Sequence, residues 1–421
     1  MKLRSIAFGL LGCVLSLASA HAQAAGWNVL RDTYMRPSLV DGFTFEWQYF
    51  MVHDAKQQFT GSIGYVLVDP RGRLGWVDAD GLTDLWQGGL FPLSVMPSGA
   101  SVALAGTWAD GTQFANYERF AQNYAVGIQD KNFTADPNAE GYFAQLLERE
   151  SVRGDAGVFQ LKGQTADAAW DLTVTPEALF ESGPEEYTTV RGFDVGFVPG
   201  EHWNVHMEWP RTRVVGTIRN LKTGKSYPID GHGYRENSWG RWNFAVDGWV
   251  FSVVSDRKQK VQWAWQTYHK SKDMDWLDVS FEDQGQPVTR RFFAKQDQLR
   301  WKLGEWFFHK EARQCVPNTV DVVAEDGDYR VRATYDLTGR QLPMLSTATA
   351  LTQIFVIMIH MPYIKGVIEN VKTGEVVTRF EGQGGGEFST TRSLWQNLPE
   401  TNCERWGRRF NTEYSALPFL D

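Results

Sequence analysis

The chain has 421 residues, of which 43% are hydrophobic, and a formal net charge of −8 at pH 7. The length is sufficient for two domains, and the acidic balance disfavours a nucleic-acid partner, because a phosphate backbone is bound by a basic face. The 18 tryptophans and 26 phenylalanines favour β-strands.

The N-terminus has the pattern of a secretory signal peptide. Lys2 and Arg4 precede a short apolar run, and A-x-A cleavage sites end at Ala20 and at Ala22. We expect a signal peptide over residues 1–22, with cleavage after Ala22 favoured over Ala20. The pattern predicts a periplasmic or secreted protein. No later transmembrane segment is predicted, because the longest apolar run, residues 354–359, is far shorter than the roughly 20 residues of a spanning helix.

Most of the chain after the leader predicts short antiparallel strands joined by polar turns. The candidate strands are residues 43–52, 60–68, 73–77, 249–255, 261–268, 276–281 and 288–293. Two further stretches, 114–122 and 139–150, are predicted to be helical. Strands of this length and spacing are typical of an antiparallel sandwich or barrel, so we predict a mostly β protein.

Two segments of the chain are copies of one internal repeat. The segment GTIRNLKTGKSYPIDGHGYRENS begins at Gly216, and GVIENVKTGEVVTRFEGQGGGEFS begins at Gly366. Each copy predicts a strand, a turn that Asn220 or Asn370 caps through its side chain, a second strand and a glycine-bearing bend. The copies either close a single barrel as equivalent strands or belong to two sub-barrels, and the single barrel is favoured.

The first copy carries groups that the second copy lacks. Glycine and glutamine in the second copy stand where the first has Tyr234 and His232, whereas the acid of Glu236 is retained as Glu387. The additional side chains indicate that the first copy has a functional role as well as a structural one. The retained acid leaves a second interpretation open, in which Glu236 and Glu387 are both structural carboxylates.

Two motifs resemble those of a known family. GYRENSWG (residues 233–240) and FEWQYF (residues 45–50) are similar to motifs of the lipocalin-like family that includes carotenoid 1,2-hydratases, AttH-like proteins and kievitone hydratase, with the lipocalin-like Diels–Alderases as more distant relatives. The resemblance implies two lipocalin-like antiparallel β-sandwich or barrel domains, which we place at residues 23–205 and 206–421.

The same resemblance implies a function. It predicts a small hydrophobic molecule, an isoprenoid or a polyene, as the substrate in an apolar cavity, with no metal and no other cofactor. Hydratases of the family often carry an Asp-His pair where this chain has Glu236 and Asn237. Glutamate can replace aspartate as an acid, but asparagine does not carry a proton as histidine does.

Proton-initiated chemistry on an alkene needs an acid in an apolar, aromatic setting. A carboxyl group in such a setting has a raised pKa, and aromatic faces stabilise a carbocation. The predicted catalytic residues are Glu236, Tyr234 and His232, and the predicted substrate-binding residues are Glu46, Trp47, Trp239, Trp242, Trp263 and Trp265. In the alternatives that remain open, Glu236 pairs with an arginine or accepts backbone N–H groups, Glu46 forms a buried ion pair, and His232 is a surface turn residue.

The cysteines and the remaining histidines indicate whether the protein has a disulfide or a metal site. Cys315 and Cys403 are the only cysteines after the leader, and an even pair in an exported protein predicts one disulfide. His202 and His206 would lie about 13 Å apart in a strand, too far for one ion. We therefore predict no metal site.

Two function classes fit the sequence best. The first is an enzyme that acts on the hydrophobic substrate by proton-initiated hydration, isomerisation or cyclisation. The second is a non-catalytic carrier of a lipid-like ligand that uses the same cavity. A structural envelope protein with a filled core is a third interpretation. An apolar cavity with an acid in its wall would favour the enzyme.

Overall fold

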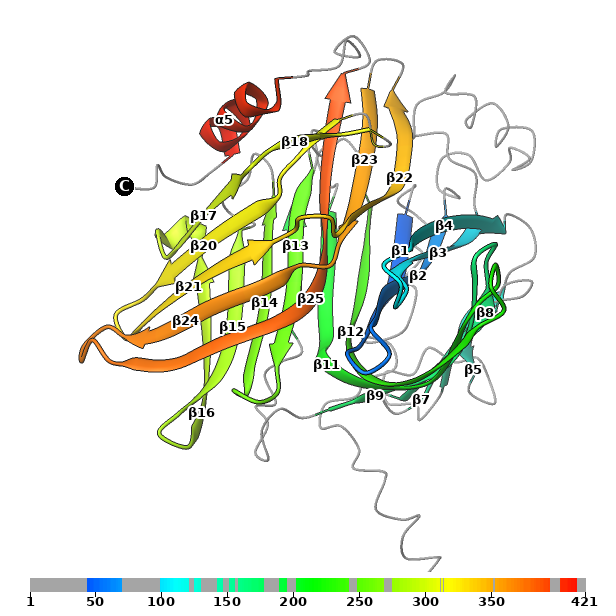
Figure 1. The fold of residues 1–421 in the computed structure, drawn as a ribbon, viewed down its shortest axis with the longest axis horizontal. Coiled ribbons are helices and arrows are strands. Elements are labelled where there is room, and N and C mark those ends of the chain that lie inside the picture. Colours follow the sequence, from blue (N-terminus) through cyan, green and yellow to red (C-terminus); the bar gives the residue numbers. More distant parts are fainter. Residues whose placement is uncertain are drawn as a thin grey trace, which may run out of the picture.

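A computed structural model describes most of the chain between residues 44 and 414. The described residues are 44–69, 99–120, 125–129, 142–146, 151–155, 158–177, 189–194, 202–241, 248–268, 275–310, 312, 314–350, 353–393 and 402–414. The predicted signal peptide, the candidate strand at 73–77 and Trp242 lie outside them. Within this part of the chain the protein is almost entirely β, as predicted, and two antiparallel sheets lie side by side (Figure 1).

The first sheet has 12 strands in the described part of the chain, in the order β4-β3-β2-β1-β12-β11-β9-β8-β7-β6-β5, with β10 paired to β11. The strands are β1 (Thr44–Asp54), β2 (Phe59–Asp69), β3 (Gly99–Thr107), β4 (Gln113–Phe120), β5 (Ala125–Gln129), β6 (Tyr142–Leu146), β7 (Ser151–Asp155), β8 (Val158–Gln164), β9 (Ala168–Pro176), β10 (Thr189–Asp194), β11 (His202–Asn220) and β12 (Ser226–Arg241). The sheet curves around its own core, in which Phe50, Trp108 and Phe159 are buried.

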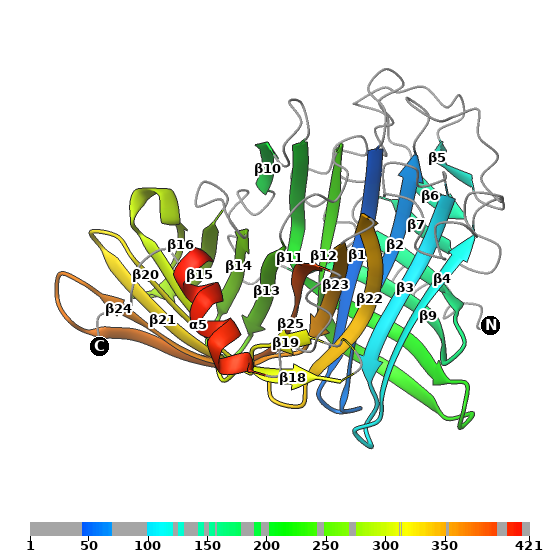
Figure 2. The same ribbon diagram turned by 90° about the horizontal axis from the view of Figure 1, so that it is seen from above.

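The second sheet has 11 strands in the described residues. Its main order is β16-β15-β14-β13-β25-β24-β21-β20-β17, and the β22–β23 hairpin joins it through β25. The elements are β13 (Trp249–Asp256), β14 (Val261–Tyr268), β15 (Trp276–Asp283), β16 (Gln286–Phe293), the short 3₁₀ helix η4 (Ala294–Gln296), β17 (Leu299–Gly304), β20 (Thr319–Glu325), β21 (Tyr329–Asp336), β22 (Gln341–Ala350), β23 (Gln353–His360), β24 (Tyr363–Asn370) and β25 (Val376–Ser393). Figure 2 shows the helix α5 (Cys403–Tyr414) crossing this sheet, near the small hairpin of β18 (Phe307–His309) and β19 (Gln314–Val316).

The predicted strands that fall within the described residues agree with the observed ones, whereas the predicted helices do not. The candidate at 261–268 coincides with β14, and those at 249–255 and 276–281 fall within β13 and β15. The helix predicted at 114–122 is wrong over residues 114–120, which belong to strand β4 and pair with β3. The helix at 139–150 is wrong at its centre, which is β6. Long-range pairing outweighs local helical preference at both places.

The two copies of the repeat are equivalent hairpins in different sheets. Asn220 Oδ1 accepts hydrogen bonds from the backbone N–H groups of Lys222 and Thr223 at 2.9 and 3.0 Å, and Asn370 makes the same two bonds in the second copy. The predicted turn is therefore confirmed. The favoured single barrel is wrong, because β11–β12 belongs to the first sheet and β24–β25 to the second.

The glycine-bearing passage is not a bend. It is the second half of the long strand β12, which pairs with β11 on one side and with β1 on the other. A Cβ at Gly233 would lie 1.8 Å from the Met51 carbonyl oxygen, and one at Gly384 would lie 2.2 Å from the Val253 carbonyl oxygen. Both glycines let a neighbouring strand approach closely. The predicted domain boundary at 205/206 falls within β11, whereas the chain changes sheet between β12 and β13. The division into domains stays a prediction.

The predicted disulfide is present and holds the C-terminal helix to the second sheet. Cys315 of β19 and Cys403 at the start of α5 are bonded, with 5.3 Å between their Cα atoms and a sequence separation of 88. The Phe410 ring of α5 then lies 5.1 Å from the Trp306 ring.

Removal of this disulfide is expected to destabilise the protein. Closing a loop of this length in the unfolded chain corresponds to about 4 kcal/mol in the chain-entropy model. We expect Cys403→Ser to lower the denaturant midpoint accordingly. Thiol titration of the unfolded, unreduced wild type should find no free thiol from this pair. Two titratable thiols would contradict the assignment.

Candidate functional site

The two sheets pack against each other through several strands: β1 contacts β25, β12 contacts β13, and β22 contacts β3 and β4. The rings of Tyr234 and Phe251 lie 5.6 Å apart across this contact. Gly385 occupies the place that Tyr234 has in the first repeat, and the Met51 side chain fills its space, with Cε only 1.3 Å from where a Cβ would lie. The differences between the repeats therefore let one sheet fit into the other.

Glu236 is enclosed at this contact and is held by neutral donors. Its side chain is 7% exposed. Trp47 Nε1 donates to Oε1 at 3.0 Å and Ser238 Oγ donates to the same oxygen at 3.3 Å, while the Tyr234 hydroxyl donates to Oε2 at 2.7 Å. The strand alternation of β12 places Tyr234, Glu236 and Ser238 on one face. Two of the predicted residues, Tyr234 and Trp47, are thus brought to Glu236.

Glu387 occupies the equivalent position in the second sheet. Trp249 Nε1 donates to its Oε2 at 3.1 Å, just as Trp47 donates to Glu236. The registers are equivalent too, because Tyr49 pairs with Glu236 and Phe251 pairs with Glu387. Oε1 of Glu387 accepts no hydrogen bond from another described residue, and part of this side chain stays accessible.

This arrangement corrects the interpretation of Glu387 as a carboxylate remote from the site. The sequence comparison placed it in a copy of the repeat without other site residues. In the structure it lies close enough to Glu236 for the charge of one to act on the other. Glu236 and Glu387 are equivalent positions of the two repeats, and this is visible in the sequence. That the two sheets bring them together is visible only in the structure.

The two carboxyl groups have different environments. Burial raises the pKa of Glu236, and the hydrogen bonds from Trp47, Tyr234 and Ser238 oppose that rise. Burial and then the charge of Glu236 raise the pKa of Glu387 to about 8, against the single hydrogen bond from Trp249. Solvent that reaches the accessible part of Glu387 weakens this rise. Of the two acids, Glu387 therefore holds its proton more readily, while the three hydrogen bonds favour the ionised form of Glu236.

Three buried tyrosines surround the pair. Burial, followed by the charge of one or both glutamates, raises the pKa of Tyr49, Tyr234 and Tyr268 well above the usual value. All three phenols consequently remain neutral and protonated at ordinary pH. Tyr234 was predicted from the sequence, but Tyr49, Tyr268 and Trp249 were not. In a strand, Trp47 and Tyr49 of FEWQYF share one face, and that signal could have found Tyr49.

A small cavity lies next to Tyr234 between the sheets. It has a volume of about 60 Å³, and its lining includes His53, His232, Tyr234, Ser255, Gln383 and Gly384. This is room for roughly two water molecules at about 30 Å³ each. The cavity is too small for an isoprenoid, so a substrate would have to reach Glu387 from its accessible side.

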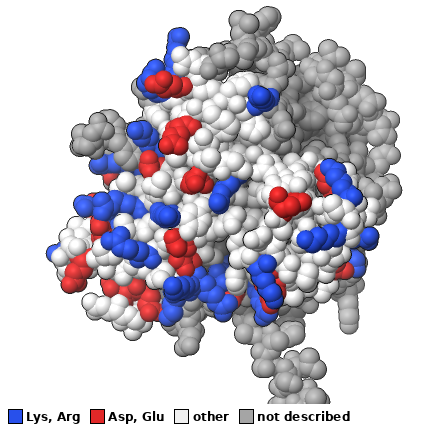
Figure 3. All heavy atoms as spheres, in the orientation of Figure 1, with Lys and Arg blue, Asp and Glu red and all other residues white. Residues whose placement is uncertain are grey.

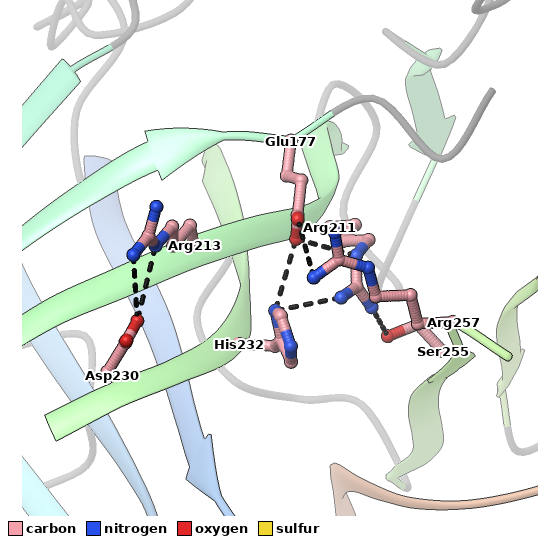
Figure 4. A network of polar contacts seen from close by, with 7 residues as sticks. All are labelled: Glu177, Arg211, Arg213, Asp230, His232, Ser255 and Arg257. Carbon is pink, nitrogen blue, oxygen red and sulfur yellow. Dashed lines mark hydrogen bonds and ion pairs between the residues drawn. The ribbon is translucent and has the colours of Figure 1, made fainter. Parts of the chain in front are cut away.

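His232 does not approach Glu236 and belongs to a separate polar cluster. Figure 4 shows it directed toward Glu177 and Arg211; its Nδ1 lies 3.1 Å from Glu177 Oε2 and 2.8 Å from an Arg211 guanidinium nitrogen. Arg211 also donates to Glu177 Oε2 and to Ser255 Oγ, both at 2.8 Å, so the cluster connects the first sheet to β13. The hydrogen bond with His232 and then the charges of Arg211 and Arg257 hold the pKa of Glu177 at about 2.

Glu177→Gln is expected to weaken the contact between the sheets. Arg211 is 2% exposed and would lose its carboxylate partner, which we expect to cost about 2 kcal/mol of unfolding free energy because Glu177 itself is only partly buried. The depressed pKa contributes stability above about pH 4.5 that is lost as the pH falls toward 2. Denaturant unfolding at pH 7 and at pH 3 measures both; equal losses at the two pH values would contradict this assignment.

The remaining predicted residues are not brought to the glutamates, or their side chains are not described. Trp263 and Trp265 are fully buried in the core of the second sheet, where both rings pack against Tyr335. They share one face of β14, and Tyr268 lies on the other. Glu46 and Trp239 are cross-strand neighbours in β1 and β12, but their side chains lie outside the described part.

The described residues show neither a metal-binding cluster nor a membrane-spanning helix. They contain no group of three or more His, Cys, Asp or Glu side chains placed to hold a metal ion. None of the helices in this part of the chain is long and apolar enough to cross a membrane. Figure 3 shows basic and acidic side chains interspersed on one face of the molecule.

Comparisons with known proteins identify the fold. No protein-family model matches the sequence, and no curated protein sequence matches it. Among solved structures, a protein described as AttH from Nitrosomonas europaea superposes with a TM-score of 0.51 and 12% identity, over 82% of this chain and 92% of that one. Kievitone hydratase from Nectria haematococca (TM-score 0.48, 9% identity, 83% and 89%) and CghA with Sch210972 (0.46, 9%, 84% and 89%) are also similar. The resemblance inferred from two short motifs is thus confirmed at the level of the fold: this chain has the architecture of the AttH protein.

Proposed function

We propose that the protein is an enzyme that transfers a proton from the Glu236–Glu387 pair to an alkene of a small hydrophobic molecule, an isoprenoid or a polyene. The observation that carries the proposal is the pair itself. Two carboxyl groups from equivalent strands lie at one contact, in environments that separate their pKa values. Perturbed carboxyl pairs of this kind are frequent at catalytic sites.

The contacts of the two acids assign their roles. Glu387 has an uncommitted oxygen and an accessible surface, so it is the acid that protonates the alkene carbon. The electrons of the double bond form the new C–H bond and leave a carbocation on the neighbouring carbon. Aromatic rings such as Trp47 and Trp249 stabilise that charge. Attack by water gives hydration, loss of a neighbouring proton gives isomerisation, and attack by a second double bond gives cyclisation.

Glu236 supports this step as the ionised partner. Its three donors hold the carboxylate in place, and its charge keeps the proton on Glu387 until an alkene arrives. Once Glu387 has delivered its proton, either carboxylate can accept the proton that the water or the carbocation releases. The residues that carry the chemistry are therefore Glu387 and Glu236, with Tyr234 as the positioning residue for Glu236. His232, predicted to be catalytic, is assigned to the contact between the sheets.

The test is incorporation of solvent hydrogen. The purified protein is incubated in D₂O with a panel of acyclic isoprenoids and polyenes, and the recovered compounds are examined by mass spectrometry for deuterium, added water or an isomeric product. Deuterium on a former alkene carbon supports the proposal. A ligand that co-purifies from the host and is returned unchanged by the protein would instead favour the carrier.

The proposal includes export to the periplasm or out of the cell. It is supported by the leader pattern of residues 1–22 and by the disulfide, which persists in an oxidising compartment. Separation of the host's cell fractions, followed by N-terminal sequencing of the protein, tests both the location and the cleavage after Ala22.

A further inference from the structure

The outer face of the second sheet carries a group of basic side chains. Cross-strand neighbours lie on the same face of a sheet, and two adjacent rows of them cross the strands β17, β20, β21, β24 and β25. One row is Arg300, Val323, Arg332, Val367 and Arg379, and the other is Lys302, Asp321, Thr334, Lys365 and Glu381. Trp301, Val322 and Phe380 alternate with these residues and are buried in the core on the other side. We call Arg300, Lys302, Arg332, Lys365 and Arg379 the basic face.

The basic face has more positive than negative charge. Its five cations stand against three carboxylates, Asp321 and Glu381 in the same rows and Glu369 at their border. Of the five cations, only Arg332 forms an ion pair with a described residue, Glu369. Asp321 accepts a hydrogen bond from the Thr334 hydroxyl at 2.8 Å. This positive excess lies on a chain whose formal net charge is −8.

The rows on either side do not extend the excess. One of them holds the ion pair of Glu325 and Arg330. On the other side, Asp336 lies close enough to Arg340 for the arginine charge to lower the pKa of the carboxyl group. The charges of both flanks are therefore balanced, and the basic face is a patch with its own boundaries.

A surface hollow of about 590 Å³ lies among these side chains. Lys302, Arg332, Lys365 and Arg379 line it, together with Asp321. These four cations are exposed, and the remaining members of the rows are mostly short valine or threonine side chains. The charged ends therefore extend furthest from the sheet. Figure 3 shows basic side chains gathered over β20, β21 and β24.

The extent of the basic face favours a broad, negatively charged partner. Neighbouring strands lie about 4.8 Å apart, so the five strands span about 19 Å. A small anion contacts only part of such an area, whereas a surface with many negative groups engages all five cations. A membrane with anionic headgroups is a surface of this kind, and each lysine or arginine near it adds to the attraction.

We propose that the basic face docks the protein on an anionic phospholipid membrane. The inference is independent of the Glu236–Glu387 pair and of the proposed reaction. Val323 and Val367, the apolar members of the two rows, are too short to reach past the charged ends into the acyl layer, so binding rests on charge and weakens in salt. Docking brings the protein to the phase in which hydrophobic molecules dissolve.

The experiment is flotation of the purified protein with phospholipid vesicles. We expect the protein to float at low salt with vesicles of phosphatidylcholine and phosphatidylglycerol in equal amounts, and to remain behind with vesicles of phosphatidylcholine alone. Raising the salt to about 1 M, where the Debye length is about 3 Å, should release it. No binding to the anionic vesicles, or equal binding to both kinds, would overturn the inference.

Variants with matched charge locate the contact. Lys302→Gln/Lys365→Gln should weaken vesicle binding at least about 10-fold, since each cation contributes roughly 5-fold. Lys162→Gln/Lys225→Gln removes the same charge from exposed positions of the first sheet and should bind as wild type does. Equal losses in both double variants would show that only the net charge matters and would refute the assignment to the basic face.

A gain of binding and a soluble competitor complete the test. Asp321→Asn removes a negative charge from the hollow and should tighten vesicle binding about 5-fold. The Thr334 hydroxyl keeps an acceptor in this variant. Unchanged or weaker binding would contradict the inference. If the protein bound inorganic tripolyphosphate through Lys302 and Lys365 but did not bind the anionic vesicles, the face would be a site for a soluble anion, and the membrane would be excluded.

Discussion

Glu387→Gln is expected to lower turnover about 100-fold or more, because general acid catalysis typically contributes 10²–10⁴. Glutamine keeps the shape of the side chain and an oxygen that can accept the bond from Trp249, but it has no proton to deliver. Glu236→Gln should have a comparable effect on turnover. It removes the charge that holds the proton on Glu387, and the variant loses the carboxylate that receives the three donors.

The measurement is the rate of deuterium transfer to whichever alkene of the panel reacts with the wild type, at saturating substrate. Binding of the neutral substrate should change little in both variants, so kcat falls while KM is retained. Glu369→Gln, on the outer face of the second sheet beside Arg332, is the control, and circular dichroism confirms that each variant is folded. If Glu387→Gln retained wild-type turnover while Glu236→Gln lost it, Glu387 would be a structural carboxylate and Glu236 the acid.

The second large effect is on stability and its dependence on pH. The folded protein keeps a proton on Glu387 up to about pH 8, whereas the unfolded chain loses it near pH 4.5. Between these values the native state binds more protons than the unfolded state, so its stability falls as the pH rises. We expect Glu387 to account for a loss of about 2 kcal/mol across this window, less than the full shift implies, because part of the side chain is accessible.

Glu387→Gln should remove this loss and should be more stable than the wild type at pH 8. Two buried histidines act in the opposite direction. Burial lowers the pKa of His53 to about 4 and that of His360 to about 3, so both favour the folded state as the pH rises toward 6.5. Both remain in the variant, and the difference between the two denaturant-unfolding curves therefore isolates Glu387. Parallel curves for wild type and variant between pH 5 and 8 would show that the Glu387 carboxyl is solvated like an ordinary surface acid.

Measurements on the Glu236→Gln and Glu387→Gln variants also distinguish the structural interpretation of the two acids from the catalytic one. If the carboxylates only stabilised their strands, glutamine at either position would change stability and leave proton transfer intact. If they form one site, both variants lose turnover, and Glu387→Gln gains stability at pH 8. A gain in stability together with a loss of activity is the usual consequence of replacing a buried functional carboxylate.

The sequence by itself determined the local structure of this protein. Strand patterns located β13 to β16 of the second sheet, with β14 placed at its observed bounds. The Asn-x-Lys-Thr-Gly turns follow from the side-chain bonds of Asn220 and Asn370, which depend only on neighbouring residues. The disulfide follows from there being two cysteines to pair. Alternation also placed Trp47 and Tyr49 on one face of β1, which is the face that carries the site.

Only the tertiary structure decided which faces meet. Alternation says which side chains share a face, but a face of aromatic and polar residues can be covered by its own sheet or by another. Trp263 and Trp265 were covered by their own sheet and became core, whereas the face of Glu236 was covered by the second sheet. That contact places Glu387 and Trp249 beside Glu236, whereas His232 lies apart and contacts Glu177. Packing of one sheet against the other brings together Glu236 and Glu387, which are 151 positions apart, through the shape of both surfaces, and no local pattern in either repeat encodes that fit.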